Sequence, residues 1–334
     1  MSRRPVRRSR RETLGKDLLE LLSVPFVELT GLLRLAAELK RKQRRGIVQQ
    51  HLQGKMLGLL FQKPSTRTRV SFEAGMNQLG GQAMVMPMAD IQLSRGESIA
   101  DTARVLSRYL DGLVIRTFDH AIVEEWAREA TIPVINGLTD LSHPCQALSD
   151  LFTIQEKKRR LRGLKIAYVG DGNNVTNSLI EASAKMGMSI AVGCPAGYLP
   201  DQHIVDRARM EAQQTGATVE ILEDAHIAVK DADVVYTDVW ISMGREREQG
   251  RRLKTLAPYQ LNERLLKRAK PDAIVMHCLP AHRGEEITAT VLDGPQSVIL
   301  DQAENRLHVQ KAVLVRLLAK RRSAPSRNIA TGRH

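Results

Sequence analysis

The chain has 334 residues, about the length of two average domains. Apolar residues make up 43% of it and charged residues 26%, which are ordinary globular values and exclude a wholly disordered or fibrous chain. The formal net charge of +13 is high, so a nucleic-acid or membrane-surface partner has to be considered first.

This positive charge lies almost entirely at the two ends of the chain. Residues 1–12 contain six arginines and one glutamate, and residues 316–334 contain six basic residues and no acid. The two ends therefore carry +11 and leave +2 for residues 13–315. A near-neutral body with only 4% aromatic residues argues against nucleic-acid binding by the folded part.

The cysteines and the apolar runs indicate the compartment. Cys145, Cys194 and Cys278 are too few and too far apart for a disulfide framework and suit a reducing compartment. No stretch approaches the roughly 20 apolar residues of a membrane helix. The N-terminal arginines are not followed by the apolar stretch of a secretory signal. The Arg-rich opening is similar to a mitochondrial transit peptide, but the run is short. We expect a cytoplasmic protein with no membrane partner.

In chain order, the first predicted element is a helix that Thr30 caps and that runs through Leu39 to a basic last turn at 40–45. Continuous apolar runs then predict strands, which are typical of parallel sheets covered on both faces. The predicted strands are Met56–Phe61, Ala83–Met86, Leu113–Arg116, Pro133–Asn136, Lys165–Val169, Ile190–Val192, Thr218–Leu222, Val234–Val239, Ile274–Cys278 and Val298–Asp301.

Amphipathic stretches between these runs predict helices. They are Val70–Leu79, Ala100–Leu110, Val123–Ala130, Leu148–Lys157, Leu179–Met186 and Asp201–Gln214. This alternation, repeated about twice, predicts an α/β fold with two doubly wound parallel-sheet domains bridged by helices. The charged run EKKRRLRG at 156–163 marks the boundary between them, and a final helix is expected from Ala303 to Lys320.

A cluster of polar residues, STRT at 65–68, stands where the first predicted strand has ended and a helix begins. The free backbone N–H groups of a helix N-terminus, with hydroxyl groups and a guanidinium, form a cradle for an anion. An ordinary N-cap would also place Ser and Thr here. The arginine and the preceding Lys63–Pro64 favour a phosphate site.

The motif HPCQ at 143–146 also follows a predicted strand and opens a helix. His143 and Gln146 fall on one helical face and offer an imidazole and an amide to one small polar group. A single histidine is often structural. Its place beyond a strand end, where ligands bind in open α/β sheets, favours a functional role.

Two further motifs end buried strands. In TDVWISMG, Asp238 could bind a cationic substrate group or simply cap the loop that carries Ser242 and Met243. In VMHCLP, Cys278 could be a nucleophile, a metal ligand or a packing residue. No second Cys/His pair has the spacing of zinc ligands, so we expect no metal. GDGNN at 170–174 lacks the third glycine of a dinucleotide motif and indicates a tight turn that presents an asparagine.

In this order and at these separations, the motifs resemble those of the aspartate/ornithine transcarbamylase family. STRT is similar to its carbamoyl-phosphate signature and HPCQ to its HPxQ element, while DxxxSMG at 238–244 and HCLP at 277–280 resemble its ornithine-specific branch. The resemblance covers about residues 25–318. It implies transfer of the carbamoyl group of carbamoyl phosphate to the δ-amine of L-ornithine, giving L-citrulline and phosphate, or the reverse. No metal or organic cofactor is implied.

The resemblance also implies a set of carbamoyl-phosphate-binding residues. They are Ser65, Thr66, Arg67, Thr68, Gln92, Arg116, His143, Gln146, Cys278, Leu279 and Arg306. His143 with Arg67, Thr68 and Arg116 would stabilise the oxyanion that forms as the amine attacks. Gln146 would orient the carbamoyl amino group, and Arg306 would close on carbamoyl phosphate.

For L-ornithine, the implied binding residues are Asn174, Asp238, Ser242 and Met243. Asp238 would bind the α-ammonium group and Asn174 the α-carboxylate end. Cys278 would receive the δ-amine, and its thiolate is one candidate for the proton acceptor. The residues that act in the chemistry would be Arg116, His143, Asp238 and Cys278. Gln92 would reach into a neighbouring subunit, which implies a homotrimer or a multiple of trimers.

The implied domains are a carbamoyl-phosphate domain at 17–155 and an ornithine domain at 156–302. A helix at 303–320 would pack back on the first domain, and basic tails would lie at 1–16 and 321–334. Gln302 departs from the family pattern, which commonly has Glu there. Another acceptor such as putrescine stays open, although Asp238, Ser242 and Met243 favour an α-amino acid. A dinucleotide-dependent dehydrogenase would need the glycine that GDGNN lacks.

Overall fold

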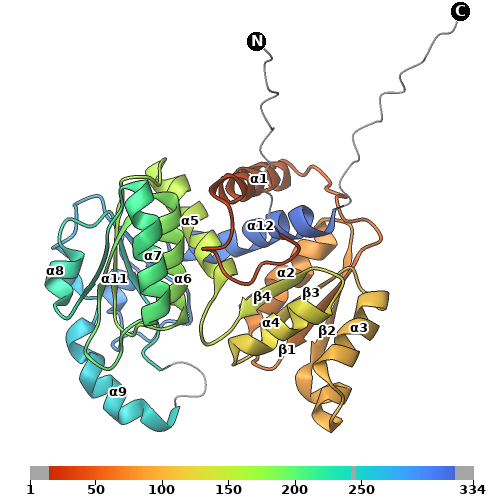
Figure 1. The fold of residues 1–334 in the computed structure, drawn as a ribbon. Coiled ribbons are helices and arrows are strands. Elements are labelled where there is room, and N and C mark those ends of the chain that lie inside the picture. The colour runs from red at the N-terminus through yellow and green to blue at the C-terminus, as the bar shows by residue number, and fades with distance from the viewer. Residues whose placement is uncertain (1–14, 242–245, 320–334) are drawn as a thin grey trace, which may run out of the picture.

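The computed structural model describes residues 15–241 and 246–319, which form two α/β units side by side (Figure 1). Each unit contains one sheet in which all strands are parallel, in the orders β2-β1-β3-β4 and β7-β6-β5-β8-β9. The predicted fold class, two parallel-sheet α/β domains, is therefore confirmed.

The first sheet is built from strands with helices between them. Its elements are β1 (Met56–Phe61), α2 (Thr66–Gln78), β2 (Gln82–Pro87), the short helices η1 (Met88–Asp90) and η2 (Gln92–Arg95), α3 (Ile99–Tyr109), β3 (Gly112–Arg116), α4 (His120–Glu129) and β4 (Val134–Leu138). All five residues of β3, one of the two inner strands, are buried, which explains its continuous apolar run.

The second sheet repeats this pattern. Its elements are β5 (Lys165–Val169), α6 (Asn174–Met186), β6 (Ser189–Gly193), α7 (Gln202–Thr215), β7 (Val219–Leu222), α8 (Ala225–Val229), β8 (Val234–Thr237), η3 (Glu246–Glu248), α9 (Gln249–Leu256), η4 (Ala257–Tyr259), α10 (Glu263–Leu266), β9 (Ile274–His277) and α11 (Ala289–Leu292). Since the strands of both sheets are parallel, the loops that follow them gather at one edge of each sheet.

Three long helices connect the two units: α1 (Phe26–Arg44), α5 (Pro144–Lys158) and α12 (Ile299–Leu318). Helix α12 packs against α1, α2 and α5, so the C-terminal part of the chain returns to the first unit (Figure 1). After α5, Arg159 takes a left-handed conformation with φ of 63° and ends the helix before β5.

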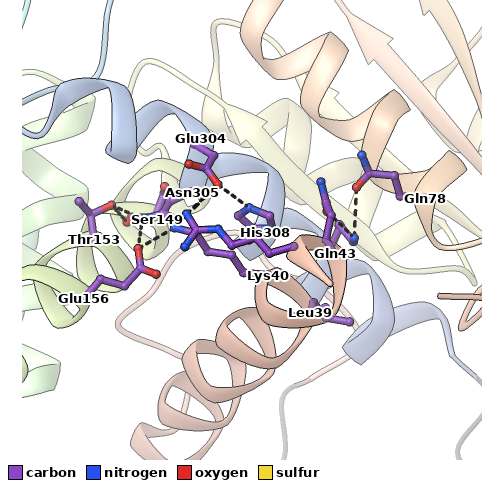
Figure 2. Close-up of polar contacts among 12 residues, drawn as sticks. Leu39, Lys40, Gln43, Gln78, Ser149, Thr153, Glu156, Glu304, Asn305 and His308 are labelled. Atoms are coloured by element: carbon purple, nitrogen blue, oxygen red, sulfur yellow. Dashed lines mark hydrogen bonds and ion pairs between the residues drawn. The ribbon is translucent and has the colours of Figure 1, made fainter. Parts of the chain in front are cut away.

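A buried polar cluster fixes α1, α5 and α12 to one another (Figure 2). We call Lys40, Thr153, Glu156 and Asn305 the Lys40 cluster. The Lys40 Nζ atom, on a side chain only 5% exposed, lies 2.8 Å from Glu156 Oε2 and 2.7 Å from Asn305 Oδ1. Asn305 Nδ2 in turn donates to Thr153 Oγ1 at 3.0 Å and to Glu156 Oε2 at 2.8 Å. The cation thus has one carboxylate and one amide oxygen within hydrogen-bond distance.

Nine of the ten predicted strands are present, and the tenth, Val298–Asp301, is wrong. Ser297 forms one isolated bridge with Val275, and α12 then begins at Ile299. A short apolar run can begin a buried helix as well as a strand, so periodicity alone could not separate them. The final helix consequently starts four residues before the predicted Ala303.

The predicted cap of the first helix is also wrong. Thr30 lies inside α1, where its Oγ1 atom donates to the carbonyl of Phe26 at 3.1 Å. The helix begins five residues earlier, with Pro25 at the N-cap, where its fixed φ of −59° and missing N–H do no harm, and Glu28 in the first turn. Among the described residues, no helix is long and apolar enough to cross a membrane.

Candidate active site

A cavity of about 880 Å³ lies between the two sheets, at the carboxyl ends of strands from both. Twelve of the predicted site residues line it: Ser65, Thr66, Arg67, Thr68, Arg116, His143, Gln146, Asn174, Asp238, Cys278, Leu279 and Arg306. Motifs up to 241 residues apart therefore meet at one place, since each follows a parallel strand or lies on a helix that packs beside one.

Three predicted residues are not placed in this cavity. Gln92 lies exposed in η2 and does not line it. Ser242 and Met243 lie outside the described residues, so their part of the predicted ornithine site is not seen.

One wall of the cavity is the N-terminus of α2. Ser65 caps this helix, and its Oγ atom accepts from the backbone N–H of Thr68 at 3.3 Å. The backbone N–H groups of the first helical turn have no partner within the helix and carry the positive end of its dipole. The cap thus leaves a polar, electropositive end beside the cavity, as the STRT motif predicts.

Three guanidinium groups, which we call the arginine cluster, converge on this wall: Arg67, Arg116 and Arg306. Arg67 Nη2 donates to the carbonyl of Leu279 at 2.7 Å, and Arg306 donates to Gln146 Oε1 at 2.7 Å and Thr68 Oγ1 at 3.2 Å. Arg116 and Arg306 are 5% and 4% exposed, and the Nε atom of each is buried with no partner among the described residues.

No carboxylate of the described residues forms an ion pair with the arginine cluster. Burial, together with the charges of Arg306 and Arg67, lowers the pKa of Arg116 to about 10. Buried cations without counter-charges are costly, so this wall is electrostatically incomplete until an anion binds.

His143 stands next to these cations, and its surroundings disfavour a charged imidazole. Its backbone N–H donates to Ser178 Oγ at 2.7 Å, while its Nδ1 atom is buried with no partner among the described residues. Burial, and then the charges of Arg306, Arg116 and Arg67, hold the pKa of the imidazole well below its ordinary value. A neutral imidazole at this position can exchange a hydrogen bond with a carbonyl group without titrating near pH 7.

A second wall of the cavity, at the carboxyl ends of β8 and β9, carries Asp238 and Cys278. Asp238 accepts from Cys278 Sγ at 2.9 Å and from Asn173 Nδ2 at 2.7 Å. Burial and then the charge of Asp238 raise the pKa of the Cys278 thiol well above its ordinary value. The resting group is therefore a thiol that donates to the carboxylate, and the thiolate considered from the sequence is disfavoured. Asn174, predicted at the ornithine carboxylate, donates to the carbonyl of Thr139 at 2.5 Å.

An ion pair that the sequence did not predict closes the second wall. Arg252 of α9 is buried, pairs with Asp171, and lies over the ring of Tyr198 with its guanidinium carbon 4.8 Å from the ring centroid. Its Nε atom donates to the carbonyl of Trp240 at 2.6 Å. In the sequence Arg252 belongs to a charged run that resembles an exposed helix face, so no pattern singles it out.

The histidine beside Cys278 is not free to bind a metal. His277 Nδ1 accepts from the backbone N–H of Leu279 at 2.8 Å, and its Nε2 atom lies 3.2 Å from Glu286 Oε1. Because both ring nitrogens already have protein partners, Asp238, His277 and Cys278 are close together without forming an open ligand set.

Comparisons with known proteins agree with this geometry. The family described as aspartate/ornithine carbamoyltransferase, carbamoyl-P binding domain, matches residues 16–156. The Asp/Orn binding domain of the same family matches residues 162–317. The matches cover the two units that face each other across the cavity.

Individual relatives are similar along most of their length. The ornithine carbamoyltransferase of Syntrophus aciditrophicus is 58% identical over 301 residues, which are 90% of this chain and 99% of that protein. The solved ornithine carbamoyltransferase of Pyrococcus furiosus has a TM-score of 0.89 and 53% identity, over 92% of this chain and 98% of its own. The solved anabolic enzyme of Campylobacter jejuni has a TM-score of 0.86 and 38% identity, over 92% and 100%.

Proposed function

The chain belongs to the aspartate/ornithine carbamoyltransferase family, and we propose that it transfers the carbamoyl group of carbamoyl phosphate to the δ-amine of L-ornithine. The products are L-citrulline and phosphate. The observation that carries this proposal is the arginine cluster, which forms no ion pair with a carboxylate of the described residues and lines the same cavity as the Asp238–Cys278 pair.

Carbamoyl phosphate fits the first wall by charge and by shape. Its phosphate is a dianion that the N-terminus of α2 and the guanidinium groups of Arg67 and Arg116 would neutralise. Its carbonyl oxygen becomes an oxyanion when the amine attacks, and His143 with Arg67, Thr68 and Arg116 would stabilise that charge. Arg306, which already contacts Thr68 and Gln146, would hold the other side of the phosphate.

L-Ornithine fits the second wall, where Asp238 would hold the α-ammonium group near Asn174, Ser242 and Met243. The nucleophile has to be the neutral δ-amine, whose ordinary pKa of about 10.4 leaves little of it at pH 7. The neighbouring arginine cluster disfavours one more cation and so favours the neutral amine. Two oriented substrates and a prepared oxyanion site require no covalent intermediate, metal or organic cofactor.

We further propose a homotrimer, or a multiple of trimers, in which Gln92 completes the site of a neighbouring subunit. The support is that Gln92 is exposed and does not line its own chain's cavity. Residues 17–155 would bind carbamoyl phosphate and residues 156–302 ornithine. A cytoplasmic location suits the three free cysteines, and the names of the anabolic relatives favour citrulline formation.

An assay with carbamoyl phosphate and four acceptors tests the reaction: ornithine, putrescine, aspartate and N-acetylornithine. We expect citrulline from ornithine and at least 100-fold lower kcat/KM with the other three, because they lack one of the groups that the second wall is built to bind. Product from putrescine and none from ornithine would overturn the assigned acceptor.

A further inference from the structure

Behind the cavity wall, four buried polar side chains form a chain of hydrogen bonds between α5, α12 and β8. They are Gln146, Asp150, Tyr236 and Gln302, and none is more than 2% exposed. Only Gln146 lines the cavity. The other three belong to none of the motifs that indicate the substrate sites, so their function has to be read from their contacts.

At the end of this chain away from the cavity, a backbone N–H group fixes the orientation of the Gln302 amide. The N–H group of His277 can only donate, and it lies 2.9 Å from Gln302 Oε1. The amide nitrogen of Gln302 therefore faces the other way, 2.7 Å from Asp150 Oδ1 and 3.0 Å from the hydroxyl of Tyr236. Asp150 Oδ1 is thereby an acceptor.

The same logic holds at the near end. Arg306 can only donate, and its Nη1 atom lies 2.7 Å from Gln146 Oε1. The amide nitrogen of Gln146 donates to Asp150 Oδ1 at 2.8 Å. Tyr236 adds a donor to the second carboxylate oxygen at 3.3 Å. Asp150 thus receives three hydrogen bonds, and reversal of the Gln146 amide would set nitrogen against Arg306 and oxygen against the carboxylate.

We propose that Asp150, held by Gln302 and Tyr236, is a positioning residue that fixes the Gln146 amide with its oxygen presented to the carbamoyl amino group. This inference rests on the proposed function of the cavity. A carbamoyl group differs from an acetyl group by an NH₂ donor in place of a methyl group. A fixed acceptor forms a hydrogen bond with the amino group, whereas beside a methyl group the acceptor itself has no donor. The fixed Gln146 oxygen therefore favours binding of carbamoyl phosphate over acyl phosphates.

Two phosphonates that do not react allow this preference to be measured as binding affinity, without turnover. Phosphonoacetamide carries the amino group, and acetonylphosphonate carries a methyl group in its place, while both keep the phosphonate and the carbonyl. In calorimetric titrations we expect the wild type to bind the amide more tightly by about 10-fold or more, as for one hydrogen bond to a fixed acceptor. In Asp150→Ala we expect the ratio of the two dissociation constants to fall below about 3.

Asp150→Asn is the conservative variant, because its amide oxygen can still accept from Gln146 and Gln302, and it should retain most of the ratio. Asn305→Ala is the matched control: it removes a buried polar side chain one turn along α12 from Gln302, in the Lys40 cluster, and should lower the thermal midpoint without changing the ratio. If Asp150→Ala fails to fold, Gln302→Met carries the test, with an expected fall in the ratio of about threefold.

An equal loss of affinity for both phosphonates in the Asp150 and Gln302 variants, or an unchanged ratio, would overturn the proposal and leave Asp150 a purely structural residue. Citrulline formation by the wild type is measured separately. Its absence would refute the proposed function, whereas a changed ratio in the titrations would still support the positioning of Gln146.

Discussion

The arginine cluster and the Lys40 cluster each contain buried cations and each involve α12, and they differ in the acceptors that surround those cations. In the Lys40 cluster, the ammonium group has carboxylate and amide oxygens within 2.8 Å (Figure 2). In the arginine cluster, two buried Nε atoms have no partner among the described residues. A cluster whose cation has acceptors holds helices together, whereas buried cations without such acceptors favour the binding of an anionic ligand.

The difference also separates neighbouring residues of one helix. Asn305 belongs to the Lys40 cluster and Arg306, the next residue of α12, to the arginine cluster. Successive residues of a helix point in directions about 100° apart, so one helix contributes to a structural contact and to the cavity lining at once. A single role can therefore not be assigned to α12 as a whole, because each face of the helix has its own contacts.

The largest expected effect is on kcat/KM, when one arginine is removed from the arginine cluster. Arg116→Met should lower kcat/KM for carbamoyl phosphate by about 10³-fold, because a charge-assisted contact to both phosphate and oxyanion is lost. The same change removes a buried charge beside two others, so the ligand-free protein should melt about 2 °C higher or more. Steady-state kinetics and thermal unfolding measure the two effects.

Lys40→Met is the matching variant in the Lys40 cluster, and it should lower stability while leaving activity nearly unchanged. It leaves Glu156 and Asn305 without their cation and should cost about 1–3 kcal/mol of unfolding free energy, since Glu156 is partly exposed. The kinetic constants should stay within a factor of two. Loss of activity in Lys40→Met with unchanged stability would remove the distinction between the clusters.

The last prediction concerns the pH dependence of stability and Asp150, which is buried behind the cavity wall. Burial raises the pKa of this carboxyl from 3.8 to about 7. Between about pH 4 and 7 the folded protein then holds a proton that the unfolded chain has released, so the free energy of unfolding falls as the pH rises. Asp150→Asn should flatten this fall by up to about 1.4 kcal/mol per pH unit in urea titrations. An unchanged slope would mean that Asp150 is ionised throughout this range.

Sequence patterns predicted those features that follow from one strand or one helix turn. The STRT and HPCQ motifs indicated positions at strand ends, and parallel strands bring such positions to one edge. They could not predict contacts between distant residues, such as Arg252 with Asp171 or Gln302 with Asp150, which are 81 and 152 positions apart. Nor could three apolar residues at 298–300 show that a helix, rather than a strand, begins there.

The most direct test of the central claim is a calorimetric titration of phosphonoacetamide into the wild type and Arg67→Ala, both without ornithine. The arginine cluster predicts saturable binding of one ligand per chain to the wild type and at least about 100-fold weaker binding to the variant. Equal affinity in the two proteins, or no binding to the wild type, would contradict the assignment of this cavity to carbamoyl phosphate.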